Sequence, residues 1–223
     1  MEWKVDFAPS YSILKIKLRP GEVVIAEPGA MVATLGDIKV ETKMKGGFLK
    51  ALARKVFAGE SMFMNTYIGG DKGGEIWLAP PVPGDIKYIE LKNSELHVQD
   101  FAYLAHHGDI EAGVKFKGFK GLLAGGGGVF WLKLKGTGGV WICGYGGIDE
   151  IELKPGEKIT VDNFHALAIE HTVDWKIKKF GGWKTFILGG EGLAIEAKGP
   201  GRVYIQSRTL PSLVELLRRY IKK

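Results

Sequence analysis

Apolar and polar residues alternate along most of the chain, which is the pattern of β-strands with one buried face. The alternation is clear at Leu14, Ile16 and Leu18, and again along residues 130–134. Glycines and polar turn residues separate such runs at intervals of about 8–12 residues, a spacing typical of sandwiches and barrels. The pattern therefore predicts an all-β protein.

The same succession of strand, turn and strand occurs three times. The copies begin at Ile13, Ile86 and Ile148, and their turns contain Pro20-Gly21, Asn93-Ser94 and Pro155-Gly156, each followed by Glu. Because a single copy would have a thin core and open strand edges, we expect the copies to pack together. The repeats predict one compact unit of three pseudo-symmetric modules, residues 1–84, 85–146 and 147–209.

Two segments have helical rather than strand periodicity. Residues 48–57 place apolar side chains on one face and bases between them, which predicts a short amphipathic helix inserted in the first module. The tail, residues 210–223, follows possible capping residues and has Pro211 at an early helical position. Its apolar face contains Leu213, Leu216, Leu217 and Tyr220. Packing of this face on the β core is favoured over a membrane or partner anchor.

The net charge of +6 is concentrated at the end of the chain. Four of the 31 Lys and Arg residues lie in the last six positions, so the other 27 nearly balance the 25 Asp and Glu residues. A nearly neutral body argues against a surface that follows nucleic-acid phosphates. No apolar run reaches the roughly 18 residues of a membrane span, and the start has no targeting pattern, so we expect a cytoplasmic protein. The five Asn and Gln residues beside many Lys and Glu form a thermophile-like composition.

Several short motifs occur in a fixed order along the chain, and together they resemble a known family. They are Pro28–Ala33, Lys45–Gly47, Gly59–Ser61, Pro83–Asp85, Phe101–Ala105, Tyr145–Gly146, Val161–Asp162, Gly189–Gly192 and Gly199–Gly201. Over nearly the whole chain up to about Arg208, the sequence is similar to the family named for altered inheritance of mitochondria protein 24. Residues 125–128 depart from it, because they are all glycine where a Gly-Glu-Gly-like turn is expected.

This resemblance implies a β-sandwich of the double-stranded β-helix type. It also implies a likeness of each module to the subunit of the tryptophan-sensing RNA-binding attenuation protein. Fungal mitochondrial members of the family are linked to inner-membrane organisation. The family supplies no established catalytic residues to carry over, so fold likeness alone does not assign an activity.

The histidines do not form a metal-binding pattern. His106 and His107 are adjacent, so on a strand they would point to opposite faces, and we interpret them as a loop pair. His165 and His171 bracket a predicted strand and would lie about 20 Å apart. We predict neither a metal nor another cofactor.

Other candidate chemistry also has a simpler structural explanation. The glycine run of residues 125–128 is followed by a strand rather than by the Lys-Ser/Thr and helix of a phosphate-binding loop. Cys143, the single cysteine, lies in a strand pattern and is expected to be a small buried apolar side chain. Glu60 and Glu191 are interpreted as turn acids that accept backbone hydrogen bonds. Three tryptophans in strand patterns are expected in the core or an interface: Trp77, Trp131 and Trp141.

These observations favour a non-enzymatic structural or interaction scaffold that is membrane-proximal and forms a homo-oligomer. An RNA- or small-molecule-binding module is the alternative, and an unrecognised hydrolase or metal enzyme is a third hypothesis. Protein and membrane-surface partners agree with the basic tail, whereas nucleic acid is weakly supported. The candidate contact surface consists of Lys50, Arg54, Lys55, Trp183, Arg218, Arg219, Lys222 and Lys223.

Overall fold

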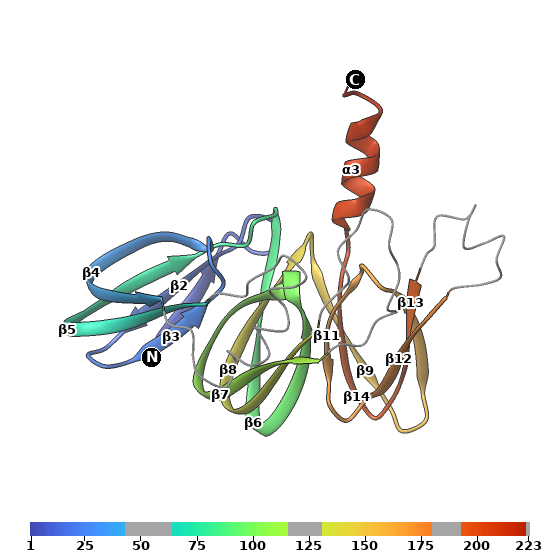
Figure 1. The fold of residues 1–223 in the computed structure, drawn as a ribbon, viewed down its shortest axis with the longest axis horizontal. Helices are drawn as coiled ribbons and strands as arrows, with labels where there is room; N and C mark the ends of the chain where they lie inside the picture. Colours follow the sequence, from blue (N-terminus) through green and yellow to red (C-terminus); the bar gives the residue numbers. More distant parts are fainter. Residues whose placement is uncertain (43–63, 116–130, 180–192, 222–223) are drawn as a thin grey trace.

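The computed structural model describes residues 1–42, 64–115, 131–179 and 193–221. Three groups of strands lie in a row, one from each third of the chain, and a C-terminal helix projects from the last group (Figure 1). The predicted all-β class and the C-terminal helix are confirmed. The helix expected at residues 48–57 lies outside the described residues.

The first third contains β1 (Glu2–Asp6), β2 (Ile13–Leu18), β3 (Val23–Ala26), β4 (Met31–Thr42) and β5 (Asn65–Leu78). The middle third contains β6 (Gly84–Gln99), the 3₁₀ turn η2 (Asp100–Ala102), β7 (Tyr103–Lys115) and β8 (Trp131–Tyr145). The last third contains β9 (Ile148–Leu153), β10 (Lys158–Asp162), β11 (Ala166–Glu170), β12 (Asp174–Lys179), β13 (Leu193–Lys198), β14 (Gly201–Gln206) and α3 (Leu210–Arg218).

One large antiparallel sheet connects the thirds, and its strands follow the order β1-β2-β5-β3-β7-β8-β6-β11-β14-β9, with β4 paired to β5. A small sheet, β10-β13-β12, belongs to the last third. The first and middle thirds join where β3 pairs with β7, and the middle and last thirds join where β6 pairs with β11. The described strands do not close into a barrel.

Three apolar cores lie in the molecule, and each combines the inward-facing side chains of one third with residues of a neighbouring third, such as Trp141 in the first core and Trp131 in the third. Leu14 and Ile16 are 0% exposed in the first core, as the alternation predicts. Leu18, Leu91 and Leu153, which the sequence aligns, are at most 4% exposed in the first, second and third cores. Three small cores in one body explain how short strands bury their apolar faces.

Two of the three predicted turns have the same hydrogen bonds. In the first, Glu22 N–H donates to Arg19 O (3.0 Å), Gly21 has φ of +77°, and the Glu22 carboxylate accepts Arg19 N–H at 2.9 Å. In the other, the matching bonds from Glu157 to Lys154 are also 3.0 and 2.9 Å, and Gly156 has φ of +83°. A proline followed by a glycine of positive φ is the arrangement of a type II turn.

The turn expected at Asn93-Ser94 is wrong, because β6 runs through it as one strand. The register with β8 shifts between Leu91 and Ser94, and Asn93 has a positive φ of 49°. Asn93 N–H donates to Thr137 Oγ1 at 3.1 Å. An extra residue in a bulge replaces the turn, since the strand has a continuous partner here. The origin of the thirds from one triplicated module stays a prediction.

His106 and His107 lie within β7, so their interpretation as a loop pair is wrong. β7 pairs with β8 through both residues, and this backbone pairing makes the segment extended. As expected for a strand, they point to opposite faces. His106 bonds the Tyr103 hydroxyl (2.7 Å), whereas His107 bonds the Tyr88 hydroxyl (3.1 Å).

The close approach of β7 to β8 provides a test of the fold. Gly108 has φ of +88°, and a Cβ at this position would lie 2.6 Å from Thr137 O and 2.7 Å from Gly138 Cα. We expect Gly108→Ala to lower the free energy of unfolding by about 2 kcal/mol or more, because strain and overlap add. Urea denaturation measures the change.

Gly113→Ala is the matched control on the same strand. A Cβ there would meet nothing nearer than Lys133 O at 3.9 Å, so the change should stay within about 0.5 kcal/mol. Equal effects of the two substitutions would contradict the described β7–β8 geometry.

Candidate functional site

Helix α3 leaves the β body at its first turn and stands clear of it (Figure 1). None of its residues is buried. The exposed fraction is 44% for Leu210, 50% for Leu216 and 78% for Tyr220 just beyond the helix. Packing of this helix on the β core, which the sequence favoured, is therefore wrong, because strands of neighbouring thirds close the cores between them.

The apolar side chains of this segment gather on one side of the helix. At 100° per residue they cover an arc of about 160°. The opposite side carries Ser212, Glu215, Arg218 and Arg219. We call the first set the apolar face of α3, and its members are Leu210, Leu213, Val214, Leu216, Leu217, Tyr220 and Ile221. The helix is therefore amphipathic, and no other element in the described part of the chain covers its apolar face.

The start of α3 agrees with the sequence prediction. Pro211 lies in the first turn, where a missing N–H costs nothing. Thr209 is the N-cap residue and is 5% exposed, but its hydroxyl bonds the Ser212 hydroxyl (2.7 Å) instead of a backbone N–H. The buried Thr209 thus attaches the helix to the body while the rest projects. No described helix has the length and apolar character needed to span a membrane.

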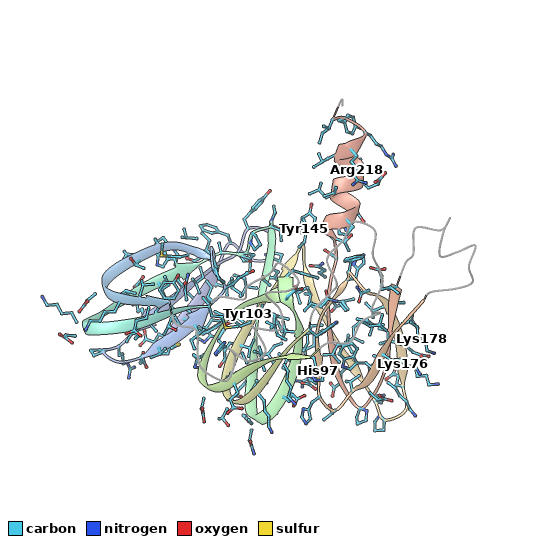
Figure 2. The ribbon with its side chains drawn as sticks, in the orientation of Figure 1. His97, Tyr103, Tyr145, Lys176, Lys178 and Arg218 are labelled. Carbon is cyan, nitrogen blue, oxygen red and sulfur yellow. The ribbon has the colours of Figure 1, made fainter. Side chains whose placement is uncertain are left out.

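A cavity of about 270 Å³ opens at the foot of α3. Its inner wall is formed by the end of β8, from Cys143 to Tyr145, together with Phe101 of η2. Its mouth includes Leu210 and Pro211 of α3. Figure 2 shows Tyr145 directly at the foot of the helix. The apolar face of α3 and the cavity therefore meet.

The cavity exists because β7 and β8 separate at this point. The last pair between them is Tyr103 with Ile142, and the chain before Tyr103 turns away as η2. Beyond Ile142, the Tyr145 N–H donates to the Gln206 side-chain oxygen at 2.7 Å instead of to a neighbouring strand. The gap between the ends of β7 and β8 is therefore lined by side chains and is not closed by backbone hydrogen bonds between strands.

The polar groups of the cavity wall have partners within the protein. Gln206 is 4% exposed, and its amide nitrogen donates to Phe164 O at 2.8 Å. The Cys143 thiol donates weakly to Phe101 O at 3.7 Å. The groups that face the space are therefore mostly apolar, and the cavity suits an apolar occupant.

Two carboxyl groups lie behind this wall. Burial, followed by the charge of Asp100, raises the pKa of Glu27 to about 7. Burial, followed by the charge of Glu27, raises the pKa of the Cys143 thiol. The same two causes raise the pKa of the Tyr103 hydroxyl. Glu27 can hold a proton near neutral pH, whereas the Cys143 thiol stays protonated and is a poor nucleophile.

The sequence did not reveal Glu27 and Asp100 as a pair, because 72 intervening positions separate them. One local signal existed: Glu27 directly follows the strand that ends with buried Ala26. A carboxyl group directly after a buried strand is close to the core and only partly exposed to solvent. Only the return of the chain through η2 brings Asp100 to it.

Among the predicted contact residues, the structure places Arg218 and Arg219 at the end of α3. Arg218 is exposed and forms a 3.6 Å ion pair with Glu215. Figure 2 places it on the part of the helix that stands clear of the β body. The other six lie outside the described residues: Lys50, Arg54, Lys55, Trp183, Lys222 and Lys223.

Of the predicted buried residues, Cys143 is 1% exposed, and Trp131 and Trp141 are 0% exposed. Those expectations are confirmed. Trp77 differs, because it lies partly exposed on the outer side of the sheet. There the Lys15 ammonium is 3.8 Å from its ring centroid, a cation–π contact. The expected turn residues Glu60 and Glu191 and the glycines of 125–128 lie outside the described residues.

A second polar cluster joins the middle and last thirds. The Trp175 indole N–H donates to His97 Nδ1 at 3.0 Å, so His97 carries its proton on Nε2 and donates it to Glu95 at 2.8 Å. His97 is 3% exposed, and Figure 2 places it between the two groups of strands. Both ring nitrogens are occupied, so this histidine holds the interface together. In the described ranges, no three His, Cys, Asp or Glu side chains group closely enough to hold a metal ion.

Comparison with known proteins identifies relatives of the whole chain. Residues 3–208 match the family model described as Mitochondrial biogenesis AIM24. An uncharacterised protein of Streptococcus pyogenes serotype M6, M6_Spy0233, is 31% identical over 99% of this chain and 91% of its own. The crystal structure of SPYM3_0169 from Streptococcus pyogenes is similar, with a TM-score of 0.82, 29% identity and 99% of each chain covered.

The partly buried carboxyl of Glu27 predicts a pH-dependent stability. The folded chain holds the Glu27 proton up to about pH 7, whereas an ordinary glutamate releases it at about 4.5. The folded state thus binds more protons in this interval, and the free energy of unfolding falls as pH rises through it, by about 3 kcal/mol. We expect Glu27→Gln to remove this loss, which stabilises the chain at pH 8 and changes little at pH 4.5.

Glu22→Gln is the control with the opposite sign. The Met1 ammonium at 2.6 Å and Arg19 N–H lower the pKa of Glu22, so its removal should destabilise the chain at pH 8. Urea denaturation at both pH values measures the two variants. A loss of stability at pH 8 for Glu27→Gln would contradict the raised pKa.

The single cysteine provides a second test of the same wall. Because Cys143 is 1% exposed and burial raises its pKa, we expect N-ethylmaleimide to label the folded chain at least about 100-fold slower than the unfolded chain at pH 8. Mass spectrometry follows the labelling, with the chain in urea as the reference. Comparable rates would show that the thiol is accessible and ionised.

Proposed function

Given that the chain belongs to the Mitochondrial biogenesis AIM24 family, we propose that its β body is a cytoplasmic, non-enzymatic scaffold that α3 attaches to an anionic membrane surface. The matched residues end at 208, and α3 begins at Leu210. The body that identifies the family and the helix that makes the contact are therefore separate parts of the chain.

The single observation that carries the proposal is the exposure of the apolar face of α3. An apolar face this wide normally packs against a core, yet here every residue of the helix stays accessible. Exposed apolar surface with a charged border marks a site of association. A short helix with large apolar residues on one side and bases on the other is typical of helices that lie in a membrane interface.

The charge of the helix end selects the type of surface. Arg218 and Arg219 lie on the side of the helix opposite the apolar face, and Lys222 and Lys223 follow them in the sequence. Each base near an anionic leaflet contributes about 1 kcal/mol of attraction. The nearly neutral body contributes little, so attraction to the membrane is concentrated at the helix.

A second copy of the chain is the other occupant to consider, since a homo-oligomer is expected from the sequence. The nine residues of α3 form a helix about 13 Å long, which offers less area than the 1,200 Å² or more of a stable dimer. Two such ends would also bring like charges together. These arguments favour the membrane.

The non-enzymatic part of the proposal rests on the chemistry of the described side chains. The Cys143 thiol is buried and protonated, and His97 has both ring nitrogens engaged. Nucleophilic catalysis needs a nucleophile with an adjacent base, and neither residue supplies one. The alternative RNA-binding function has less support, because the net positive charge is at the tail.

Vesicle binding tests the proposal. We expect the chain to sediment with vesicles containing 30% anionic lipid at least tenfold more strongly than with zwitterionic vesicles, and 0.5 M salt to weaken the binding. Leu216→Ser with Leu217→Ser should abolish binding to both. Arg218→Gln with Arg219→Gln should remove mainly the anionic preference, by about tenfold.

Val32→Ser with Val40→Ser is the matched control, because these valines of β4 are 51% and 53% exposed but lie away from the helix. This variant should bind like the unaltered chain. If the leucine variant dissociates an oligomer while vesicle binding never occurs, the helix is a contact between copies and the membrane proposal is wrong. Salt-dependent RNA binding that survives removal of residues 210–223 would also overturn it.

A further inference from the structure

We propose that the cavity at the foot of α3 binds one acyl chain whose acidic head group lies at Arg208. The source of the chain in the cell, a membrane lipid delivered along α3, rests on the proposed function. The binding site itself is a property of the β body and of the first turn of the helix. It can therefore be tested without a membrane.

The chemistry of the cavity selects an apolar occupant. The Gln206 side-chain oxygen accepts the Tyr145 N–H and its amide nitrogen donates to Phe164 O, so this buried amide is engaged within the wall. Phe101, Cys143 and Val82 contribute apolar surface. A polar ligand would lose its water without replacement hydrogen bonds, whereas an alkyl chain gains from burial.

The size of the cavity sets the length of chain that fits. A 150 Å³ cavity holds the six carbon atoms of benzene, which is about 25 Å³ per carbon. By this scale, the cavity of about 270 Å³ holds roughly ten carbon atoms. The occupant is thus a molecule of about ten carbon atoms, such as a single alkyl chain or its end.

The mouth of the cavity has an apolar path, and a positively charged residue neighbours the lining residues in the chain. Leu210 lines the mouth and also begins the apolar face of α3, so apolar surface runs from the helix into the cavity. Arg208 lies between the lining residues Gln206 and Leu210, and its N–H donates to Tyr145 O at 3.2 Å. Its exposed guanidinium donates one bond to Ser207 O at 2.9 Å. The remaining donors suit a carboxylate or phosphate head.

Isothermal titration with saturated fatty acids tests the site in the absence of vesicles. We expect affinity to rise about fourfold per methylene from hexanoate to decanoate and to level off near ten or eleven carbons. Decanoate should also slow labelling of Cys143 by N-ethylmaleimide in urea-free buffer, since the thiol lines the space. Absence of decanoate binding, or no dependence on chain length, would overturn the proposal.

Val82→Trp fills the cavity and should lower decanoate affinity at least tenfold. Val32→Trp, at an exposed valine of β4, is the matched control and should leave it unchanged. Leu210→Trp at the mouth is a second blocking variant, and because Leu210 is 44% exposed it should not disturb folding. Unchanged decanoate affinity in both blocking variants would place the ligand elsewhere and overturn the proposal.

Arg208→Gln tests the head group. It should weaken decanoate binding several-fold and leave binding of the neutral decanol unchanged, whereas Arg19→Gln should affect neither. Equal loss for both ligands would overturn the assignment of the head group to Arg208.

The two proposals fail in distinguishable ways. Leu216→Ser with Leu217→Ser alters residues outside the cavity and should keep full decanoate affinity. Decanoate binding without vesicle binding would support the cavity and reject the membrane attachment. Vesicle binding without any decanoate binding would do the reverse.

Discussion

Backbone hydrogen bonding between strands of different thirds is the constraint on which the rest of the structure depends. Only two residue pairs, Ile25 with His106 and Ala26 with Ala105, join β3 to β7. Three pairs join β6 to β11. The apolar cores include residues of neighbouring thirds, so these short ladders and the shared cores together hold the thirds in one body. The positions of these two ladders also determine which strand edges of the large sheet stay unpaired.

The cavity is a consequence of this constraint. β8 pairs with β6 up to Tyr145, but its pairing with β7 stops at Ile142. The next backbone donor, Tyr145 N–H, is bonded by the side chain of Gln206 from the last third. A side-chain amide thus takes the place of a strand and leaves space at its side. The partly buried carboxyl of Glu27 lies in the same region, and its raised pKa agrees with a cost of placing a charge there.

The division of the chain into body and helix separates fold from function. The match to the family model ends at residue 208, and the relative from Streptococcus pyogenes is described as uncharacterised. Similarity to these relatives therefore supports the fold of the β body and says nothing about what α3 does. Helix α3 adds an exposed apolar face with bases nearby, and the proposal of an anionic membrane partner rests on that combination. The cavity at its foot extends that chemistry into the body. The likeness of each third to the attenuation-protein subunit stays a prediction.

The sequence by itself determined the properties that are local in the chain. Strict alternation placed Leu14, Ile16 and Leu18 in a core, and the Pro-Gly pairs at residues 20–21 and 155–156 specified their turns, because both depend on neighbouring residues only. The family motifs likewise lie in the linear order of residues. The amphipathic character of α3 was readable for the same reason.

Only the tertiary structure decided what depends on distant neighbours. Asn93-Ser94 became a bulge rather than a turn because β8 continues to pair with β6 across it. Helix α3 projects instead of packing because other strands already close the cores, which a local pattern cannot show. Glu27 and Asp100 come near Cys143, and the cavity opens, only where β7 and β8 of the middle third part. Periodicity reports which face of an element is apolar, but the space that this face meets is set by the whole fold.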